Sequence, residues 1–185
     1  MVPRTAESTL RELAKGYPVL ALTGPRQSGK TTLARAVFPI HPYVSLENPA
    51  QREFAQSDPQ GFLNKYADGA IIDEAQRCPE LFAWLQGVVD QQQRPAHFIL
   101  AGSQPFGLMS GITQSLAGRV ALLNLLPFSA EELRQGKLLP ASLDEAIFKG
   151  CYPPIYDRHL EPGIWYANYL QTLPIRLIAK MRIRC

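Results

Sequence analysis

The chain has 185 residues, of which 46% are hydrophobic and 19% are charged, and its formal net charge is +3. This composition excludes a disordered chain and fits a folded globular domain with room for a small second part. No apolar run reaches the roughly 20 residues that cross a bilayer, and no signal-peptide core opens the sequence, so we expect a cytoplasmic protein.

The positive charge is concentrated at the end of the chain. Four basic residues and no acid lie in residues 171–185, and removing these four from the total of +3 leaves −1 for residues 1–170. The body of the protein therefore gives no general argument for a polyanion partner. The cysteines and histidines are widely spaced and predict neither a disulfide framework nor a zinc site.

Short apolar segments rich in Val, Ile and Leu alternate with longer amphipathic ones. This alternation is typical of a parallel sheet covered by helices on both faces, so we expect an α/β fold. In chain order we predict helix 8–15, strand 18–23, helix 30–38, strand 43–46, helix 49–56, strand 70–73, helix 79–92, strand 97–102, helix 105–116 and strand 119–126. Helices 129–135, 142–149 and one from residue 162 follow, with a break at Pro153-Pro154.

Several helix starts carry capping residues. Asn48 is expected to cap the helix that begins at Pro49, with Gln51 reaching back to it. Two later pairs have the spacing of capping boxes, namely Ser129 with Glu132 and Ser142 with Glu145.

The first predicted strand runs into a segment with the spacing G-x-x-x-x-G-K-T, which opens the next helix. Its glycines, Gly24 and Gly29, let backbone N–H groups surround a phosphate, and the helix N-terminus adds its dipole. Lys30 is expected to bridge the β- and γ-phosphates, Thr31 to bind Mg²⁺, and Thr32 to follow in the first turn. The alternative, a plain glycine turn, does not require a lysine followed by a hydroxyl residue.

The strand at residues 70–73 ends in two carboxylates, Asp73 and Glu74. Parallel topology places such a strand tip beside the phosphate loop. We expect Asp73 to hold Mg²⁺, directly or through water, and Glu74 to polarise the attacking water. An acidic turn after a strand is the alternative, which the upstream phosphate loop disfavours. A base next to the metal carboxylate favours hydrolysis over phosphoryl transfer to a metabolite.

A guanine nucleotide is disfavoured by the residues around these motifs. Gln76 stands where a GTPase has a glycine three residues after the aspartate, and Asn64-Lys65 is not followed by the aspartate of N-K-x-D. ATP is therefore the nucleotide expected, by elimination.

One complete strand and helix lie between the two motifs, which predicts the strand order 5-1-4-3-2. In this order the strand at residues 97–102 places Ser103 opposite the γ-phosphate as a sensor, with Gln104 as the second choice and an ordinary loop start as the alternative. Arg119, just before the fifth strand, is a candidate cation for the developing phosphate charge, from the same chain or a neighbour. A surface arginine is the alternative interpretation.

Six segments together resemble a known family: residues 24–32, 43–49, 71–76, 100–104, 115–119 and 126–129. They are similar to the bacterial and archaeal AAA-type ATPases whose core precedes a domain called DUF4143, over about residues 4–170. The resemblance implies an AAA+-like P-loop core, three layers of α/β/α with a five-stranded parallel sheet, which binds ATP and Mg²⁺.

We expect three parts: an ATPase core at residues 1–128, a small helical lobe at 129–170 and a divergent basic tail at 171–185. In the resembled family the stretch after residue 170 leads into a long C-terminal domain, and here the likeness stops. One hypothesis is that the tail is a frameshifted or truncated end, which could be disordered. A natural short variant whose basic amphipathic tail touches membrane or nucleic acid is the other.

The expected function is Mg²⁺-dependent ATP binding and hydrolysis, as a switch or motor for a protein or nucleic-acid effector of unknown identity. A homo-oligomer would be needed if Arg119 acts on a neighbouring chain. One alternative is an ATP-binding regulatory module with little turnover because the C-terminal domain is missing. Another is a small-molecule kinase, which would transfer phosphate to an acceptor other than water.

Overall fold

The structure is a computed structural model that describes residues 2–103, 112 and 115–172. The chain divides into two compact units, Pro3–Pro127 and a second one that joins Met1–Val2 to Phe128–Cys185. Gln104, most of the predicted helix at 105–116 and the tail from residue 173 lie outside the described residues. Within the described part, no helix has the length and apolar character needed to cross a membrane.

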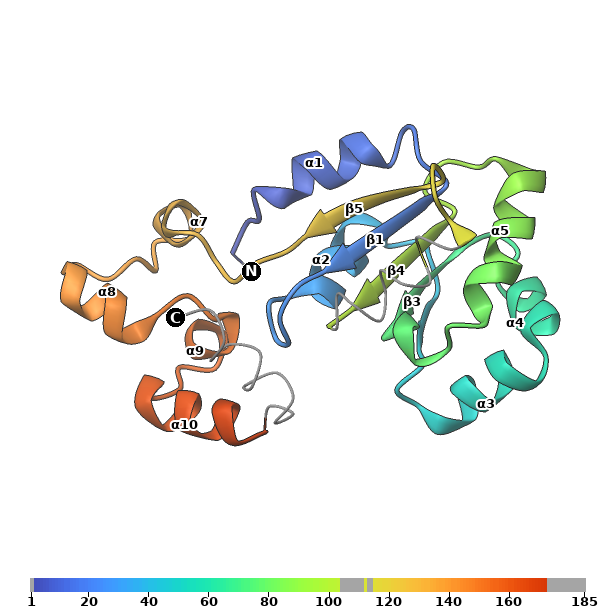
Figure 1. Cartoon of the computed structure of the whole chain (residues 1–185). Coiled ribbons are helices and arrows are strands. Elements are labelled where there is room, and N and C mark those ends of the chain that lie inside the picture. The colour runs from blue at the N-terminus through green and yellow to red at the C-terminus, as the bar shows by residue number, and fades with distance from the viewer. Residues whose placement is uncertain (1, 104–111, 113–114, 173–185) are drawn as a thin grey trace. The chain divides into compact units, whose positions relative to one another are not determined.

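The first unit is built on a parallel sheet of five strands in the order β2-β3-β4-β1-β5 (Figure 1). The strands are β1 (Val19–Thr23), β2 (Tyr43–Ser45), β3 (Ala70–Asp73), β4 (Phe98–Gly102) and β5 (Val120–Asn124). This order confirms the prediction 5-1-4-3-2. Because all strands are parallel, the ends of β1, β3 and β4 meet at one edge, where Thr23 pairs with Gly102 and Asp73 with Ala101.

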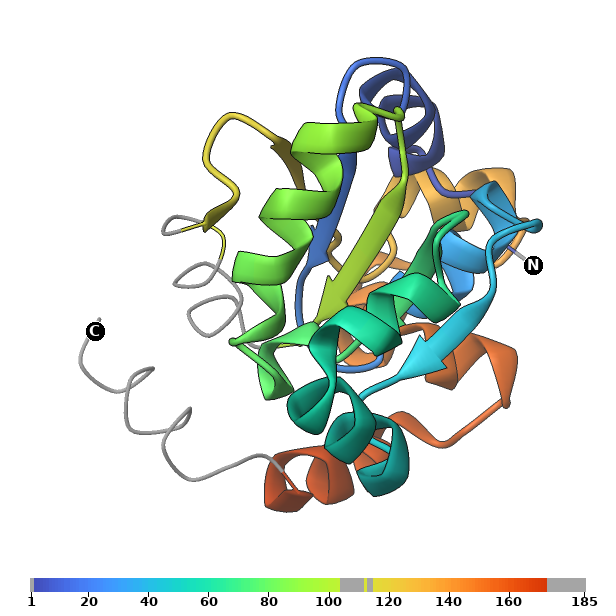
Figure 2. The ribbon, with the colours of Figure 1, turned by 90° about the vertical axis from the view of Figure 1, so that its right-hand side faces the viewer.

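Helices cover both faces of this sheet. Side chains alternate along β1, so that Leu20 and Leu22 pack on one face while Val19 and Ala21 pack on the other. The first face is covered by α1 (Ala6–Leu13) and α2 (Lys30–Val37), and the second by α3 (Pro49–Ser57), α4 (Pro59–Lys65) and α5 (Leu81–Gln92). The side that carries α3, α4 and α5 faces the viewer in Figure 2. Burial on both faces explains why β1, β3 and β4 are continuous apolar runs, whereas β2 and β5 are partly exposed.

Two Pro-initiated helices follow one another after β2. The Asn48 side chain caps α3 as expected, since its Oδ1 accepts hydrogen bonds from the amides of Ala50 at 2.9 Å and Gln51 at 3.4 Å. The return contact from Gln51 is not formed, because its buried Oε1 has no partner among the described residues. α4 is absent from the predicted elements, and Asp58 caps it by accepting from the Gly61 amide at 2.8 Å.

The second unit is helical. It contains α7 (Ala130–Gln135), α8 (Leu143–Lys149), α9 (Pro153–Asp157) and α10 (Pro162–Thr172). Its core is formed by Val2, Phe128, Leu133, Ile155 and Tyr156. The predicted break at Pro153-Pro154 was wrong, because the two prolines begin α9. Proline fits this first turn because the backbone N–H groups there have no partner within the helix.

The two expected capping boxes differ in completeness. Ser129 Oγ accepts from the Glu132 amide at 3.1 Å, and Glu132 Oε2 accepts from the Ser129 amide at 2.9 Å, so the box of α7 is complete. At α8 the structure shows one half, in which Ser142 Oγ accepts from the Glu145 amide at 3.2 Å. Each cap satisfies amides that an N-terminal helix turn leaves without partners.

Candidate nucleotide site

The turn between β1 and α2 has a backbone that only glycine adopts without strain. Gly24 has a φ of 139° and Gly29 a φ of 94°. A Cβ atom added to Gly24 would lie 2.1 Å from the carbonyl oxygen of Leu125, so the loop also packs directly on the end of β5. The loop therefore delivers its backbone N–H groups and the N-terminus of α2 to one point, which suits an anionic phosphate.

Lys30 is the first residue of α2, directly after this loop, and it is 7% exposed. Its Nζ donates to the carbonyl oxygens of Gly24 at 3.0 Å and Pro25 at 2.8 Å. Burial lowers the pKa of the ammonium group, while the carboxylates of Glu74 and Asp73 act in the opposite direction. The loop thus holds a cation beside its own amides, as phosphate binding requires.

Asp73 is the meeting point of three elements. Its Oδ2 accepts a hydrogen bond from Thr31 Oγ1 of α2 at 2.8 Å and another from the Tyr43 hydroxyl of β2 at 3.0 Å, and its Oδ1 accepts from the Glu74 amide at 3.0 Å. Tyr43 is not among the predicted site residues. It reaches Asp73 because β2 pairs with β3 in a register that places Tyr43 opposite Ile71, and no motif spacing defines that register.

The hydroxyl of Thr31 and the carboxylate of Asp73 are hard oxygen ligands of the kind that Mg²⁺ prefers. No group of three or more His, Cys, Asp and Glu side chains gathers into a metal site within the described ranges. A metal ion that is held by only one or two protein oxygens takes its other ligands from substrate phosphates and water, which is the usual arrangement for Mg²⁺. These two residues therefore fit a Mg²⁺ ion that arrives with a nucleotide.

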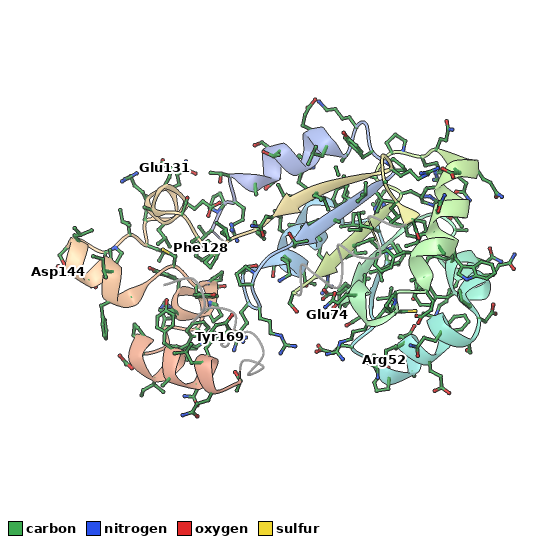
Figure 3. All side chains as sticks on the ribbon, in the orientation of Figure 1. Arg52, Glu74, Phe128, Glu131, Asp144 and Tyr169 are labelled. Atoms are coloured by element: carbon green, nitrogen blue, oxygen red, sulfur yellow. The ribbon has the colours of Figure 1, made fainter. Side chains whose placement is uncertain are left out.

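Glu74 follows β3 at the same edge of the sheet (Figure 3). Its backbone is left-handed, with φ 52° and ψ 40°, which is strained for a residue other than glycine. Its Oε2 accepts from Ser103 Oγ at 3.1 Å and from Gln76 Nε2 at 2.5 Å. The structure therefore brings Ser103, at the end of β4, to the carboxylate that we expect to act as base. In the sequence, Gln76 counts only against a GTPase, so its contact with Glu74 is not predicted.

The other predicted residues lie apart from this cluster. Thr32 is exposed in the first turn of α2. Arg119 precedes β5 at the amino-terminal edge of the sheet, where its backbone carbonyl accepts from the Val19 amide, and its guanidinium donates to Asp90 of α5 at 2.5 and 2.8 Å. The length of a five-residue strand, about 16 Å, separates this edge from the phosphate loop. Within one chain Arg119 does not join the site.

Arg4 braces the phosphate loop from outside. Its guanidinium donates to the Ser28 carbonyl at 2.8 Å and to the Leu126 carbonyl at 2.6 Å. It thereby fastens the loop to the segment that follows β5. No sequence pattern predicts this contact, because its partners lie 24 and 122 residues away.

Comparison with known proteins identifies the family of the chain. The AAA domain family matches residues 16–134, which include the phosphate loop and every strand. The chain belongs to the AAA domain family. An uncharacterized protein of Mycobacterium tuberculosis, Rv2008c, and one of Mycobacterium bovis, Mb2031c, are each 34% identical to it over 98% of this chain. The chain spans 41% of the length of these two relatives.

Solved structures share the fold of this AAA domain. A Walker-type ATPase of Pyrococcus abyssi superposes with a TM-score of 0.60 at 21% identity, covering 98% of this chain and 75% of that one. A DNA replication initiation factor superposes with a TM-score of 0.50 at 18% identity, covering 77% of this chain and 52% of that one. At these identities the likeness concerns the arrangement of strands and helices, which is that of P-loop ATPases.

Proposed function

We propose that this AAA domain binds ATP with Mg²⁺ and hydrolyses it. The observation that carries the proposal is the 2.8 Å contact between the hydroxyl of Thr31 and the carboxylate of Asp73. This contact joins Thr31, which follows Lys30 at the start of α2, to Asp73 at the end of β3, which precedes Glu74. A glycine turn that binds no nucleotide would not require a hydroxyl in the first helical turn to contact a carboxylate at the end of a neighbouring strand.

In this proposal each residue has a defined role toward the nucleotide. The amides between Gly24 and Gly29 and those at the N-terminus of α2, where Thr32 lies in the first turn, bind the β-phosphate. The Lys30 ammonium group moves from the loop carbonyls to the β- and γ-phosphates. Thr31 and Asp73 hold Mg²⁺, which would neutralise charge on the β- and γ-phosphate oxygens.

Glu74 is the proposed base. It accepts a proton from a water molecule whose oxygen attacks the γ-phosphorus, while the bond from that phosphorus to the β,γ-bridging oxygen breaks and ADP and phosphate form. Ser103 donates to the Oε2 of Glu74 at 3.1 Å and so orients the carboxylate. In this position it responds to any shift of Glu74 that accompanies the loss of the γ-phosphate.

The test separates binding from turnover. Glu74→Gln should bind ATP as the parent does, measured by titration calorimetry, and should hydrolyse it about 100- to 1,000-fold more slowly, measured by phosphate release. Lys30→Ala should lose ATP binding. Glu53→Gln, which removes an exposed carboxylate from α3, serves as the matched control and should behave as the parent. Unchanged hydrolysis by Glu74→Gln would exclude its role as base.

A second candidate is an ATP-binding module with little turnover. It is favoured by the two donors, Gln76 and Ser103, that already occupy the Oε2 of Glu74. Tight ATP binding without phosphate release by the parent chain would support this module over the ATPase. Phosphate release stimulated by Gln76→Ala would show that the Gln76 contact restrains the base.

The proposed ATPase cycle requires an effector that responds to it. The curated relatives are more than twice as long as the matched region, which leaves room in them for an effector region such as the DUF4143 domain of the resembled family. We propose a protein or nucleic-acid effector that senses the nucleotide state of the AAA domain. Co-purification of a longer relative with ATP and with ADP would test whether partners change with the nucleotide.

A further inference from the structure

Tyr43 touches the site without belonging to either sequence motif. Its hydroxyl donates to Asp73 Oδ2 at 3.0 Å, and the same oxygen accepts from Thr31 Oγ1 at 2.8 Å. The other oxygen, Oδ1, accepts from the Glu74 amide. A carboxylate offers about four acceptor positions, so three donors leave it little freedom to rotate.

The ring of Tyr43 is itself held in place. β2 pairs with β3 in a fixed register, in which Tyr43 lies opposite Ile71 and Ser45 opposite Asp73. The guanidinium of Arg35, one helical turn after Thr31 on α2, lies 5.2 Å from the ring centroid. Elements on both sides of Asp73 therefore fix the direction in which the phenol donates.

We propose that Tyr43 is a positioning residue, which holds the Asp73 carboxylate beside the Thr31 hydroxyl so that the two form a ready pair of oxygen ligands for the metal of a metal–nucleotide complex. This inference rests on the proposed function. Groups that orient a metal ligand commonly change metal affinity by about 10- to 100-fold when they are removed. Tyr43 acts through Asp73 and does not touch the nucleotide in this assignment.

The test removes only the hydroxyl. Tyr43→Phe keeps the ring beside Arg35, and Mn²⁺ binding is measured by electron paramagnetic resonance in the presence of a non-hydrolysable ATP analogue. We expect the variant to bind Mn²⁺ about 10-fold more weakly or worse, and to bind the analogue in EDTA as the parent does. Tyr17→Phe is the matched control, since Tyr17 and Tyr43 are both 39% exposed.

A double-mutant cycle distinguishes positioning from general support of the fold. If Tyr43 acts through Asp73, adding Tyr43→Phe to Asp73→Asn should not weaken Mn²⁺ binding further. Equal Mn²⁺ affinity of Tyr43→Phe and the parent, or additive losses in the cycle, would overturn the inference and leave the proposed function standing. A parent chain that binds neither the analogue nor its Mn²⁺ complex would overturn both.

Discussion

Local geometry requires glycine at residue 24. A Cβ atom at this position would approach the Leu125 carbonyl oxygen to 2.1 Å, and the φ of 139° is unfavourable for any other residue. The phosphate loop therefore lies as close to the end of β5 as two backbones can approach. A methyl group here must push the loop away from the strand.

Gly24→Ala should consequently lower the free energy of unfolding, by about 1–3 kcal/mol. The measurement is urea unfolding followed by circular dichroism. Gly87→Ala is the control, because Gly87 lies inside α5 and a Cβ atom there meets nothing within 4 Å. That change should stabilise the protein by about 0.5–1 kcal/mol through helix propensity. Equal shifts for the two variants would contradict the close approach.

His97 makes the stability depend on pH. It is 2% exposed, and its Nε2 lies 2.9 Å from the Ala67 carbonyl oxygen. Burial lowers its pKa, Arg94 and His41 lower it further, and the Ala67 carbonyl and Asp68 oppose the change. The unfolded chain therefore binds a proton at a higher pH than the folded chain does. The unfolding free energy rises with pH in that range, so stability is lost as the pH falls below about 6.5.

Unfolding free energies between pH 5 and pH 8 test this dependence. His97→Gln should flatten the decline at acid pH, because the amide does not titrate. His159→Gln, which replaces an exposed histidine, should keep the slope of the parent. A slope that His97→Gln leaves unaltered would assign the acid sensitivity to other groups.

The site residues differ in how far the sequence could predict them. Lys30, Thr31 and Asp73 were expected together because their spacing relative to a strand and a helix start is defined by phosphate chemistry. Tyr43 and Arg4 were missed, since each reaches the site through a contact between distant elements that has no fixed spacing. Arg119 was predicted as a site residue because it directly precedes β5. The start of a parallel strand lies at the amino-terminal edge of the sheet, whereas the phosphate loop lies at the opposite edge.

At the scale of elements, the start of α3 shows how much one side chain contributes. Asn48 satisfies two amides of the first turn, and an N-cap of this kind stabilises a protein by about 1 kcal/mol relative to alanine. Asn48→Ala should lower the midpoint of thermal unfolding accordingly. Ser57→Ala is the control on the same helix, because that hydroxyl reaches only the Phe54 carbonyl at 3.5 Å. A similar effect of both changes would argue against the cap.

The strands were predicted within one or two residues at each end, because short apolar runs between polar segments stand out in the sequence. The short helices α4 and α9 and the 3₁₀ turn Ala75–Arg77 were not predicted. Each is too short for an apolar period to repeat, and α4 and α9 begin at prolines, which also mark loops. Their existence is decided by packing against longer elements.

At the scale of the whole molecule, the place of Arg119 separates a contribution within one chain from a contribution between chains. It lies at the edge of the sheet opposite the phosphate loop and pairs with Asp90. If Arg119 stabilises the developing phosphate charge, it does so in a neighbouring copy. A mixture of Arg119→Ala and Glu74→Gln chains should then hydrolyse ATP faster than the two do separately, because the second chain supplies its arginine to the intact site of the first.

Asp90→Asn is the control for the ion pair, and it should retain hydrolysis because Arg119 is still present. Activity of the mixture equal to the sum of its parts would exclude a contribution between chains. Full activity of Arg119→Ala alone would remove any role of Arg119 in hydrolysis.

The sheet order has a consequence for how the protein is made. β1 carries the phosphate loop, yet its neighbours are β4 and β5, whose residues pair with Val19 from positions 98 and 120. The ribosome therefore synthesises the phosphate loop well before the strands that flank β1. The hydrogen bond from Arg4 to the Leu126 carbonyl can form only after residue 126 has been synthesised. Contacts this distant in sequence form late and slowly. Nucleotide binding by a nascent chain would thus indicate that nearly all of the first unit has left the ribosome and folded. A shorter nascent chain contains the phosphate-loop sequence but lacks the strands that complete the site.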